Sequence, residues 1–271
     1  MKWSQDAENA IANVPFFVRK RVRKRVEEEA ARSGAAVVTL GHVETCRRRF
    51  LTKMEDEVKG CRIEACFGPS GCPNRAVADD DLAKHLEMVA ESKNLRSFLA
   101  GRVDGALKIH HEFQIGLADC PNGCSRPHIA DIGLLGACCP EVGDADCSQC
   151  GACVTACREG GIILGNATGG PEIDFDKCVS CGQCVKVCPS GTLRSGAIGY
   201  RVLVGGKLGR HPQLGLQLPR ILARDEAVGF ADAVLEFYKE NNVQGERFGE
   251  MLNRYGMENF LSYIRKKGIL I

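Results

Sequence analysis

Apolar residues recur at helical spacing in the first part of the chain, which predicts a small helical unit at residues 1–45. The pattern runs from Trp3 to Val18 and is broken once, at Pro15. A basic helix is expected at residues 19–25, followed by three glutamates that can pair with it. Ser33 and Gly34 end this helix, and residues 35–40 then form a short apolar strand or turn.

Helical and extended patterns are mixed in the rest of the chain, which predicts an α+β fold. Residues 77–99 have a helical period, and residues 107–117 are expected to form a strand. A second strand is expected at residues 200–204 and ends in two glycines. Two amphipathic helices, at residues 225–241 and 248–266, are expected to close the chain.

Composition and charge exclude several classes of protein. The 271 residues carry a net charge of +2, which implies no bulk attraction to nucleic acid or membranes. No apolar run approaches the roughly 18 residues of a membrane span. The N-terminus lacks the apolar stretch of a signal peptide. Sixteen cysteines in so long a chain suit metal binding better than a secreted disulfide scaffold, so we expect a cytoplasmic protein.

Twelve of the sixteen cysteines fall into three sets of four with the spacing of 4Fe–4S clusters. Two consecutive runs have the x2-x2-x3 spacing of ferredoxins: Cys147, Cys150, Cys153 and Cys157, then Cys178, Cys181, Cys184 and Cys188, which precedes Pro189. The third set is split between Cys66 and Cys72, which have five residues between them, and Cys120 and Cys124 in the segment Cys-Pro-Asn-Gly-Cys.

In a two-cluster ferredoxin, the fourth cysteine of each run ligates the cluster of the other run. One cluster is therefore assigned to Cys147, Cys150, Cys153 and Cys188, and the other to Cys157, Cys178, Cys181 and Cys184. Gly151 and Gly182 let the backbone fold tightly around them. Zinc sites use similar spacings, but eight cysteines in this order favour clusters and an electron relay.

The split set carries a resemblance to a known family. Cys66-x5-Cys72 and Cys120-Pro-Asn-Gly-Cys124, with Asp-Ile-Gly-Leu-Leu-Gly at residues 131–136, resemble the sirohaem-binding sulfite and nitrite reductases. The resemblance implies that these four cysteines hold a 4Fe–4S cluster and that Cys124 also bridges to the sirohaem iron. The glycine-rich stretch at residues 205–212 would lie beside the macrocycle, and Asn122 would support the loop or the macrocycle.

The ferredoxin module is inserted directly after that strand, which is similar to the small anaerobic, dissimilatory-type sulfite reductases. The resemblance covers residues 60–271 and predicts an α+β sirohaem reductase-type domain with a two-cluster ferredoxin-like insertion and a small N-terminal helical domain. The segments are a helical domain at 1–45, the first part of the sirohaem domain at 46–143, the insertion at 144–194 and the second part at 195–271.

The N-terminal unit has a separate likeness. Trp3 and the segment at residues 14–19 resemble the small C-terminal domain of light-independent protochlorophyllide reductase subunits, which lies beside a tetrapyrrole site. A dimerisation or packing element is the alternative interpretation.

Sirohaem bears eight carboxylates, so its site needs several cations. The candidate residues are Arg47, Arg48, Arg49, Lys53, Arg75, Arg126, Lys207 and Arg210. The alternative interpretation of each residue is an ordinary solvated surface charge. This alternative is stronger for the four residues that precede Cys66 than for those inside the motifs.

One feature departs from the family pattern. The strand that enters the Cys120 motif usually carries two lysines for the anionic substrate, and Glu112 and Gln114 stand in their places. The same strand offers His110 and His111, with Lys108 just before them, as candidate catalytic groups. Neighbouring histidines on a strand would point to opposite faces, and ordinary surface or core histidines are the alternative.

These features predict a sirohaem-dependent six-electron reductase with three 4Fe–4S clusters, acting on sulfite first and nitrite second. The alternative is an electron-transfer subunit without catalysis. The expected partners are a small oxyanion and an electron-donor protein, within a homo-oligomer or a larger complex. Four cysteines outside the three sets are expected to be buried thiols or bystanders: Cys46, Cys61, Cys138 and Cys139.

Overall fold

Two units, each with its own core, make up the protein. The computed structural model describes residues 1–165 and 169–271, and the side chains of residues 51–56 are outside the description. The first unit contains Met1–Val58 and Ala106–Ile109, and the second contains Lys59–Gly105 and His110–Ile271.

The first unit is helical, as the N-terminal pattern predicts. Its elements are β1 (Lys2–Trp3), α1 (Gln5–Ala12), α2 (Phe16–Arg32), β2 (Val37–Val38) and α3 (Leu40–Asp56). Pro15 separates α1 from α2 and occupies the N-cap of α2, where its missing N–H leaves no hydrogen bond unmade. The short strands β1 and β2 pair in parallel. The predicted boundary at residue 45 falls within α3.

Ion pairs and a small apolar cluster hold this unit together. Ala7, Val26, Ala30 and Val38 form its core. The Arg23 guanidinium donates to both carboxylate oxygens of Glu8, at 2.6 and 2.7 Å. It also lies 4.3 Å from the Trp3 ring centroid. One arginine of the basic helix is thus paired within its own unit, although its partner is Glu8 and not one of the three glutamates that follow the helix.

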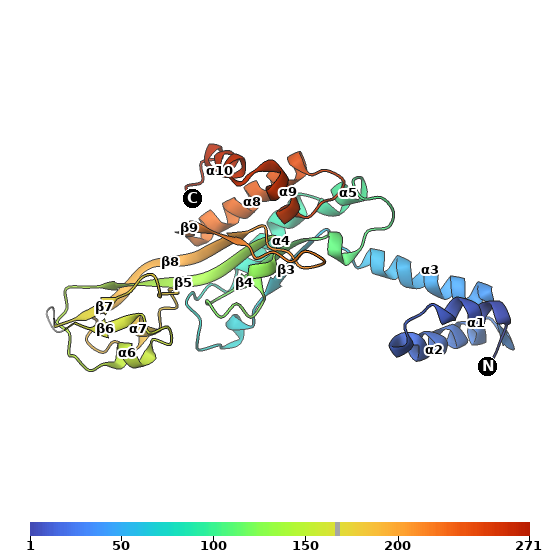
Figure 1. The fold of residues 1–271 in the computed structure, drawn as a ribbon, viewed down its shortest axis with the longest axis horizontal. Coiled ribbons are helices and arrows are strands. Elements are labelled where there is room, and N and C mark those ends of the chain that lie inside the picture. Colours follow the sequence, from blue (N-terminus) through green and yellow to red (C-terminus); the bar gives the residue numbers. More distant parts are fainter. Residues whose placement is uncertain (166–168) are drawn as a thin grey trace. The chain divides into compact units, whose positions relative to one another are not determined.

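A five-stranded sheet forms the centre of the second unit (Figure 1). Its strands, in spatial order, are β3 (Cys61–Ala65), β4 (Phe113–Ala118), β5 (Ile132–Val142), β8 (Leu193–Val204) and β9 (Leu216–Leu222). The first three run parallel, and β8 and β9 are antiparallel to their neighbours. The helices are α4 (Leu82–Ser92), α5 (Leu95–Ala100), α8 (Arg224–Asn241), α9 (Phe248–Tyr255) and α10 (Met257–Lys266).

Several predicted elements are confirmed with changed boundaries. The helix predicted at 77–99 is two helices, because Asn94 at their junction has a left-handed φ of 48°. The helix predicted at 248–266 is likewise broken, at Gly256 with a φ of 94°. The strand predicted at 107–117 begins only at Phe113. Strand β9 was not among the predicted elements.

The ferredoxin-like insertion extends from the longest strand pair of the sheet. Strands β5 and β8 form an antiparallel ribbon whose pairing continues to Val142 and Leu193, beyond the neighbouring strands. The insertion between these two residues contains α6 (Ala152–Ala156), β6 (Ile162–Leu164), β7 (Pro171–Ile173) and α7 (Gln183–Lys186). Figure 1 shows these short elements gathered at the far end of the ribbon.

Two glycines of the segment at 131–136 are required by close backbone approach. A Cβ on Gly133 would lie 2.2 Å from the Pro127 carbonyl oxygen, and one on Gly136 would lie 2.3 Å from the Asp119 carbonyl oxygen. The glycines therefore let β5 pack against the loop that contains Cys120 and Cys124. Among the helices that the structure describes, none has both the length and the hydrophobicity to cross a bilayer.

Candidate functional site

The split set of cysteines lies at one end of the parallel strands. Cys66 directly follows β3, and Cys120 follows β4 by two residues. The register pairs Ala65 with Leu117, so both cysteines leave the sheet at the same edge. Burial raises the pKa of Cys120, and the neighbouring thiols of Cys72, Cys124 and Cys66 raise it further. The structure thus brings together four thiols that are far apart in the sequence.

Hydrogen bonds and an ion pair hold the loop between Cys66 and Cys72. The Cys66 sulfur accepts from the backbone N–H groups of Gly68, at 3.4 Å, and Asp119, at 3.3 Å. Arg75 Nε lies 2.7 Å from the nearly buried Asp119 carboxylate. Arg75, a candidate macrocycle contact, is therefore engaged in holding this loop.

The ferredoxin-type cysteines are brought together in the crossed order. One small cavity is lined by Cys147, Cys150, Cys153 and Cys188. A larger cavity of about 670 Å³ is lined by Cys157, Cys178, Cys181 and Cys184. Gly151 and Gly182 occupy the N-caps of α6 and α7 with φ values of 72° and 68°. These left-handed conformations explain why the turns around the thiols need glycine.

Backbone N–H groups point at the sulfur atoms of both sets. Cys147 accepts from Gln149, and Cys178 from Ser180, each at 3.4 Å. Cys157 accepts from Gly161 at 3.3 Å. Such bonds are those that stabilise cluster thiolates. Within the described residues, no three His, Cys, Asp or Glu side chains lie close enough together to hold a single metal ion, whereas the four thiols of each set line a cavity.

The large cavity also connects the second ferredoxin set to the split set. Besides its four cysteines, it is lined by Cys120, Pro121 and Asn122. Lys186, which lies between Cys184 and Cys188 in the chain, donates to the carbonyl oxygens of Pro73, at 3.3 Å, and Arg75, at 2.5 Å. The insertion is therefore attached directly to the loop that contains Cys72.

A second cavity, of about 270 Å³, lies beside the residues that follow Cys124 in the chain. It is lined by Glu64, His110, Gln114, Ile115, Gly116, Ser125, Arg126, Ile129, Ala130, Leu208, Gly209 and Arg247. Cys124 precedes two of these residues and has an exposed thiol. The Asn122 side-chain amide donates to this thiol at 3.0 Å. Arg126 has a left-handed φ of 59° and lies 2.9 Å from Glu64.

Arg247 was not among the predicted site residues. Its guanidinium donates to both carboxylate oxygens of the fully buried Asp131, at 3.3 and 2.7 Å. Burial raises the pKa of Asp131, and Arg247 opposes that effect. Asp131 also accepts from the Gln114 backbone N–H at 2.8 Å. The partners are 116 residues apart, so no local pattern could have revealed the pair.

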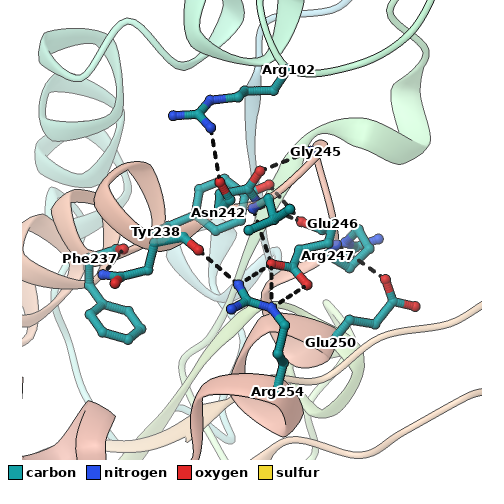
Figure 2. A network of polar contacts seen from close by, with 11 residues as sticks. Arg102, Phe237, Tyr238, Asn242, Gly245, Glu246, Arg247, Glu250 and Arg254 are labelled. Atoms are coloured by element: carbon teal, nitrogen blue, oxygen red, sulfur yellow. Dashed lines mark hydrogen bonds and ion pairs between the residues drawn. The ribbon is translucent and has the colours of Figure 1, made fainter.

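The loop between α8 and α9 places Arg247 (Figure 2). The Glu246 carbonyl oxygen accepts from the Tyr238 hydroxyl at 3.0 Å and from the Asn242 side chain at 2.8 Å. The Glu246 carboxylate is ion-paired with Arg254. These contacts fix Glu246 from three directions, so the next residue, Arg247, leaves the loop toward the sheet.

The two predicted cations of the glycine-rich stretch, Lys207 and Arg210, differ in their burial and their partners. Lys207 is nearly buried and lies 2.7 Å from the Glu250 carboxylate. Arg210 is exposed, although its neighbours Leu208 and Gly209 line the second cavity.

The cations that precede Cys66 belong to the first unit. Arg47, Arg48 and Arg49 are exposed, and Arg49 is ion-paired with Glu29. The side chain of Lys53 lies outside the described residues.

The histidine prediction needs correction. His110 and His111 lie not on a strand but on a 3-10 turn, η2 (Ile109–His111), with their ring centroids 4.2 Å apart. They do not point to opposite faces of a sheet, and His110 lines the second cavity. Lys108 is exposed and belongs to the first unit. Glu112 is buried and accepts from the Lys59 backbone N–H at 2.7 Å.

The four remaining cysteines are free thiols in three different settings. Cys46 packs against the core of the first unit. Cys61 lies on β3, where burial raises its pKa to about 12. Cys138 and Cys139 lie on β5 near the second ferredoxin set, and the Cys138 N–H donates to the Ser180 carbonyl oxygen at 2.7 Å.

The fold and the three thiol sets define an iron–sulfur protein of the oxidoreductase class. Residues 63–268 match the family described as nitrite and sulphite reductase 4Fe-4S domain, and the chain belongs to this family. Residues 3–47 match a second family, described as proto-chlorophyllide reductase 57 kD subunit. The family resemblance inferred from the cysteine motifs is thereby confirmed.

Two curated relatives and one solved structure show how far the similarity extends. A coenzyme F420-dependent sulfite reductase of Methanocaldococcus jannaschii is 35% identical over 204 residues, which is 74% of this chain and 30% of the relative. A light-independent protochlorophyllide reductase subunit of Pelodictyon phaeoclathratiforme is 52% identical over 40 residues, 15% of this chain and 8% of the relative. A dissimilatory sulfite reductase I structure shares the fold, with a TM-score of 0.53 and 19% identity over 86% of this chain and 59% of that one.

Proposed function

We propose that this chain is the sirohaem- and cluster-binding part of a reductase that converts sulfite to sulfide. The observation that supports it is the position of Cys124. This exposed thiol belongs to the split set of four, and the two residues that follow it, Ser125 and Arg126, line the second cavity. A cluster and an oxyanion site would thus meet at one side chain.

The residues present fit the proposed cofactors. Each set of four thiols would hold one 4Fe–4S cluster, and the crossed order of the ferredoxin sets agrees with the requirement of such clusters. Arg126 and Arg247 line the second cavity, and each is already paired with a carboxylate of the chain, Glu64 and Asp131. Their remaining N–H groups are suited to bind a carboxylate or an oxyanion. When bound through Cys124, the sirohaem iron would supply a centre at which a small oxyanion is reduced by single electrons.

The chain's own side chains would orient the anion and supply protons. The sulfite dianion takes up six electrons and eight protons to give hydrogen sulfide and three molecules of water, so the reaction consumes negative charge and protons at one place. Arg126 and Arg247 carry the positive charge on the cavity, and His110 offers an imidazole, a group that can take up and release protons. We assign anion binding to the two arginines and proton delivery to His110.

One observation favours a second candidate, an electron-transfer subunit. At the two positions where lysines were expected, Glu112 is buried and accepts a hydrogen bond from the Lys59 backbone N–H, and Gln114 brings an uncharged amide to the cavity. The chain also spans only 30% of the F420-dependent relative.

The proposal includes partners. It includes a protein that supplies electrons, such as a flavin or iron–sulfur protein, and assembly into a homo-oligomer or a larger complex.

Anaerobic turnover of the reconstituted full chain tests the function. Reduced viologen would supply electrons, sulfite and nitrite would be offered separately, and sulfide and ammonia would be quantified. We expect steady sulfide formation. Ammonia alone would move the assignment to nitrite. Absence of both products, in protein shown by its spectrum to hold sirohaem, would reject the reductase and favour electron transfer.

The attachment of the insertion by Lys186 leads to a separate prediction. Lys186→Ala removes the donor to the Pro73 and Arg75 carbonyls, so the second ferredoxin set should sit less closely against the split set. We expect turnover to fall on the order of 10-fold, because small misplacements of reacting groups are costly. Cluster–cluster magnetic coupling, measured by electron paramagnetic resonance, should weaken in parallel.

A matched control is Lys177→Ala, which removes an exposed ion pair with Asp174 in the same insertion. Equal behaviour of the two variants would contradict a role for Lys186 in attachment.

A further inference from the structure

Arg201 is a partly buried cation on the face of the sheet that carries the split set. It lies on β8 directly opposite Leu135 of β5, and directly opposite residues of antiparallel strands share a face. Leu135 packs with Ala118 and Leu203, and Cys66 packs against this cluster. The side chain of Arg201 therefore starts from the surface on which Cys66 lies.

Within the described ranges 1–165 and 169–271, the side chain of Arg201 leaves one of its donors unused near the second ferredoxin set, whose Cys181 forms a β-bridge with Cys138 of the neighbouring strand β5. Burial lowers the pKa of Arg201, and the Cys178 and Cys181 thiols are near enough to act in the opposite direction. One terminal nitrogen donates to the Gln217 side chain at 3.4 Å. The Nε–H is buried and has no hydrogen-bond partner among the described residues. A buried donor left unpaired costs free energy, so such a group calls for an acceptor.

A second unpaired donor points to the same place. Gln183 lies in the chain between Gly182 and Cys184 and lines the large cavity with the four cysteines of this set. Its amide nitrogen is also buried without a partner in the part of the chain that the structure describes. Two independent orphan donors beside one set of thiols indicate a missing acceptor there, and the sulfides and thiolates of a cluster accept hydrogen bonds.

We propose that Arg201 and Gln183 donate hydrogen bonds to the cluster at Cys157, Cys178, Cys181 and Cys184, and that they set its reduction potential above that of the other ferredoxin cluster. Reduction adds one negative charge to a cluster, and a partly buried cation, together with hydrogen-bond donors, stabilises that charge. The inference rests on the cluster assignment of the proposed function.

The other ferredoxin set has a different surrounding. The hydrogen bonds that the structure gives to Cys147 and Cys188 come from backbone N–H groups and the Ser190 hydroxyl. The cluster with the higher potential would also be the one whose cavity is lined by Cys120 of the split set. Electrons would therefore pass from the cluster of lower potential to the cluster of higher potential, which is the one nearer to the split set.

Redox titration of the reconstituted full chain, followed by electron paramagnetic resonance, tests this inference. In Arg201→Gln we expect the reduced form of one cluster to be destabilised about tenfold, which for one electron is about 59 mV. Arg201→Lys keeps the charge and should shift the potential less, while Gln183→Leu should shift it in the same direction as Arg201→Gln. Arg194→Gln is the matched control, because Arg194 lies on the same strand but is exposed and paired with Glu141.

The following outcomes overturn the inference: an unshifted potential in Arg201→Gln, an equal shift in Arg194→Gln, or a shift confined to the other cluster. Iron and sulfide analysis shows whether each variant is fully loaded. If Arg201→Gln fails to load its clusters, unshifted potentials in Arg201→Lys and Gln183→Leu overturn it instead. The titration needs no sulfite, so a protein that fails the turnover assay can still pass or fail this test.

Discussion

Sulfite-dependent turnover should fall by more than about 100-fold when Cys124 is replaced by serine, because even partners of metal ligands are typically worth 10- to 100-fold. Cys124 is the exposed member of the split set, and its sulfur accepts a hydrogen bond from Asn122. A serine oxygen is a poor substitute for a soft thiolate toward iron. Turnover with reduced viologen and the visible spectrum of the reconstituted protein are the two measurements.

Cys46→Ser is the matched control, since Cys46 is a half-buried thiol in the other unit and outside the three sets. It should retain turnover and spectrum. A Cys124→Ser protein with native turnover would reject the bridging role and with it the main support for the proposed function. Loss of turnover with an unchanged spectrum would place the defect in substrate binding rather than in the cofactor, and would also contradict the bridge.

The grouping of the ferredoxin-type cysteines was predictable from the sequence, because the spacing that 4Fe–4S clusters require is a local feature of the chain. The crossed order of the ferredoxin sets depends on local turns, and Gly151 and Gly182 adopt the left-handed conformations that those turns require. Local spacing could not group the split set, because Cys66 and Cys120 meet only through the parallel pairing of β3 and β4. There the family resemblance supplied what periodicity could not.

The roles of the cations were less predictable, since a sequence shows charge but not its partner. Arg75 closely follows the first cysteine pair and Lys207 lies in the glycine-rich stretch, yet each is engaged by a carboxylate, Asp119 and Glu250. Arg247 lines the second cavity because of an ion pair with a residue 116 positions away. Long-range pairing of this kind leaves no periodic or spacing signal.

The predicted strand position of His110 and His111 was wrong for a local reason, whereas their catalytic role stays a prediction. Apolar residues such as Leu107 and Ile109 made the segment before Cys120 look extended, but the strand begins at Phe113 and a 3-10 turn precedes it. In that turn neighbouring side chains are not placed on opposite faces, and the two imidazole rings contact each other. Strand alternation was therefore the wrong rule for these two residues.

Replacing Asp131 by alanine should strongly destabilise the second unit. Asp131 is fully buried, and it accepts hydrogen bonds from the Arg247 guanidinium and the Gln114 backbone N–H. Removing one partner of a buried pair leaves the other charge uncompensated, at a cost of about 3–5 kcal/mol. For a unit of this size the apparent thermal midpoint of the reconstituted protein should fall on the order of 10 °C.

Asp174→Asn is the comparison, because it removes a carboxylate from an exposed ion pair with Lys177 and should leave the midpoint unchanged. If the thermal midpoint of Asp131→Ala equals that of the unmodified protein, the pair with Arg247 contributes little to the stability of the fold. Arg247→Lys separates stability from the site: it keeps a cation for Asp131 but loses the planar fork. That variant should retain most of the thermal stability, because the buried carboxylate stays compensated, and lose turnover, because the second cavity loses the guanidinium N–H groups that Asp131 leaves available for an oxyanion.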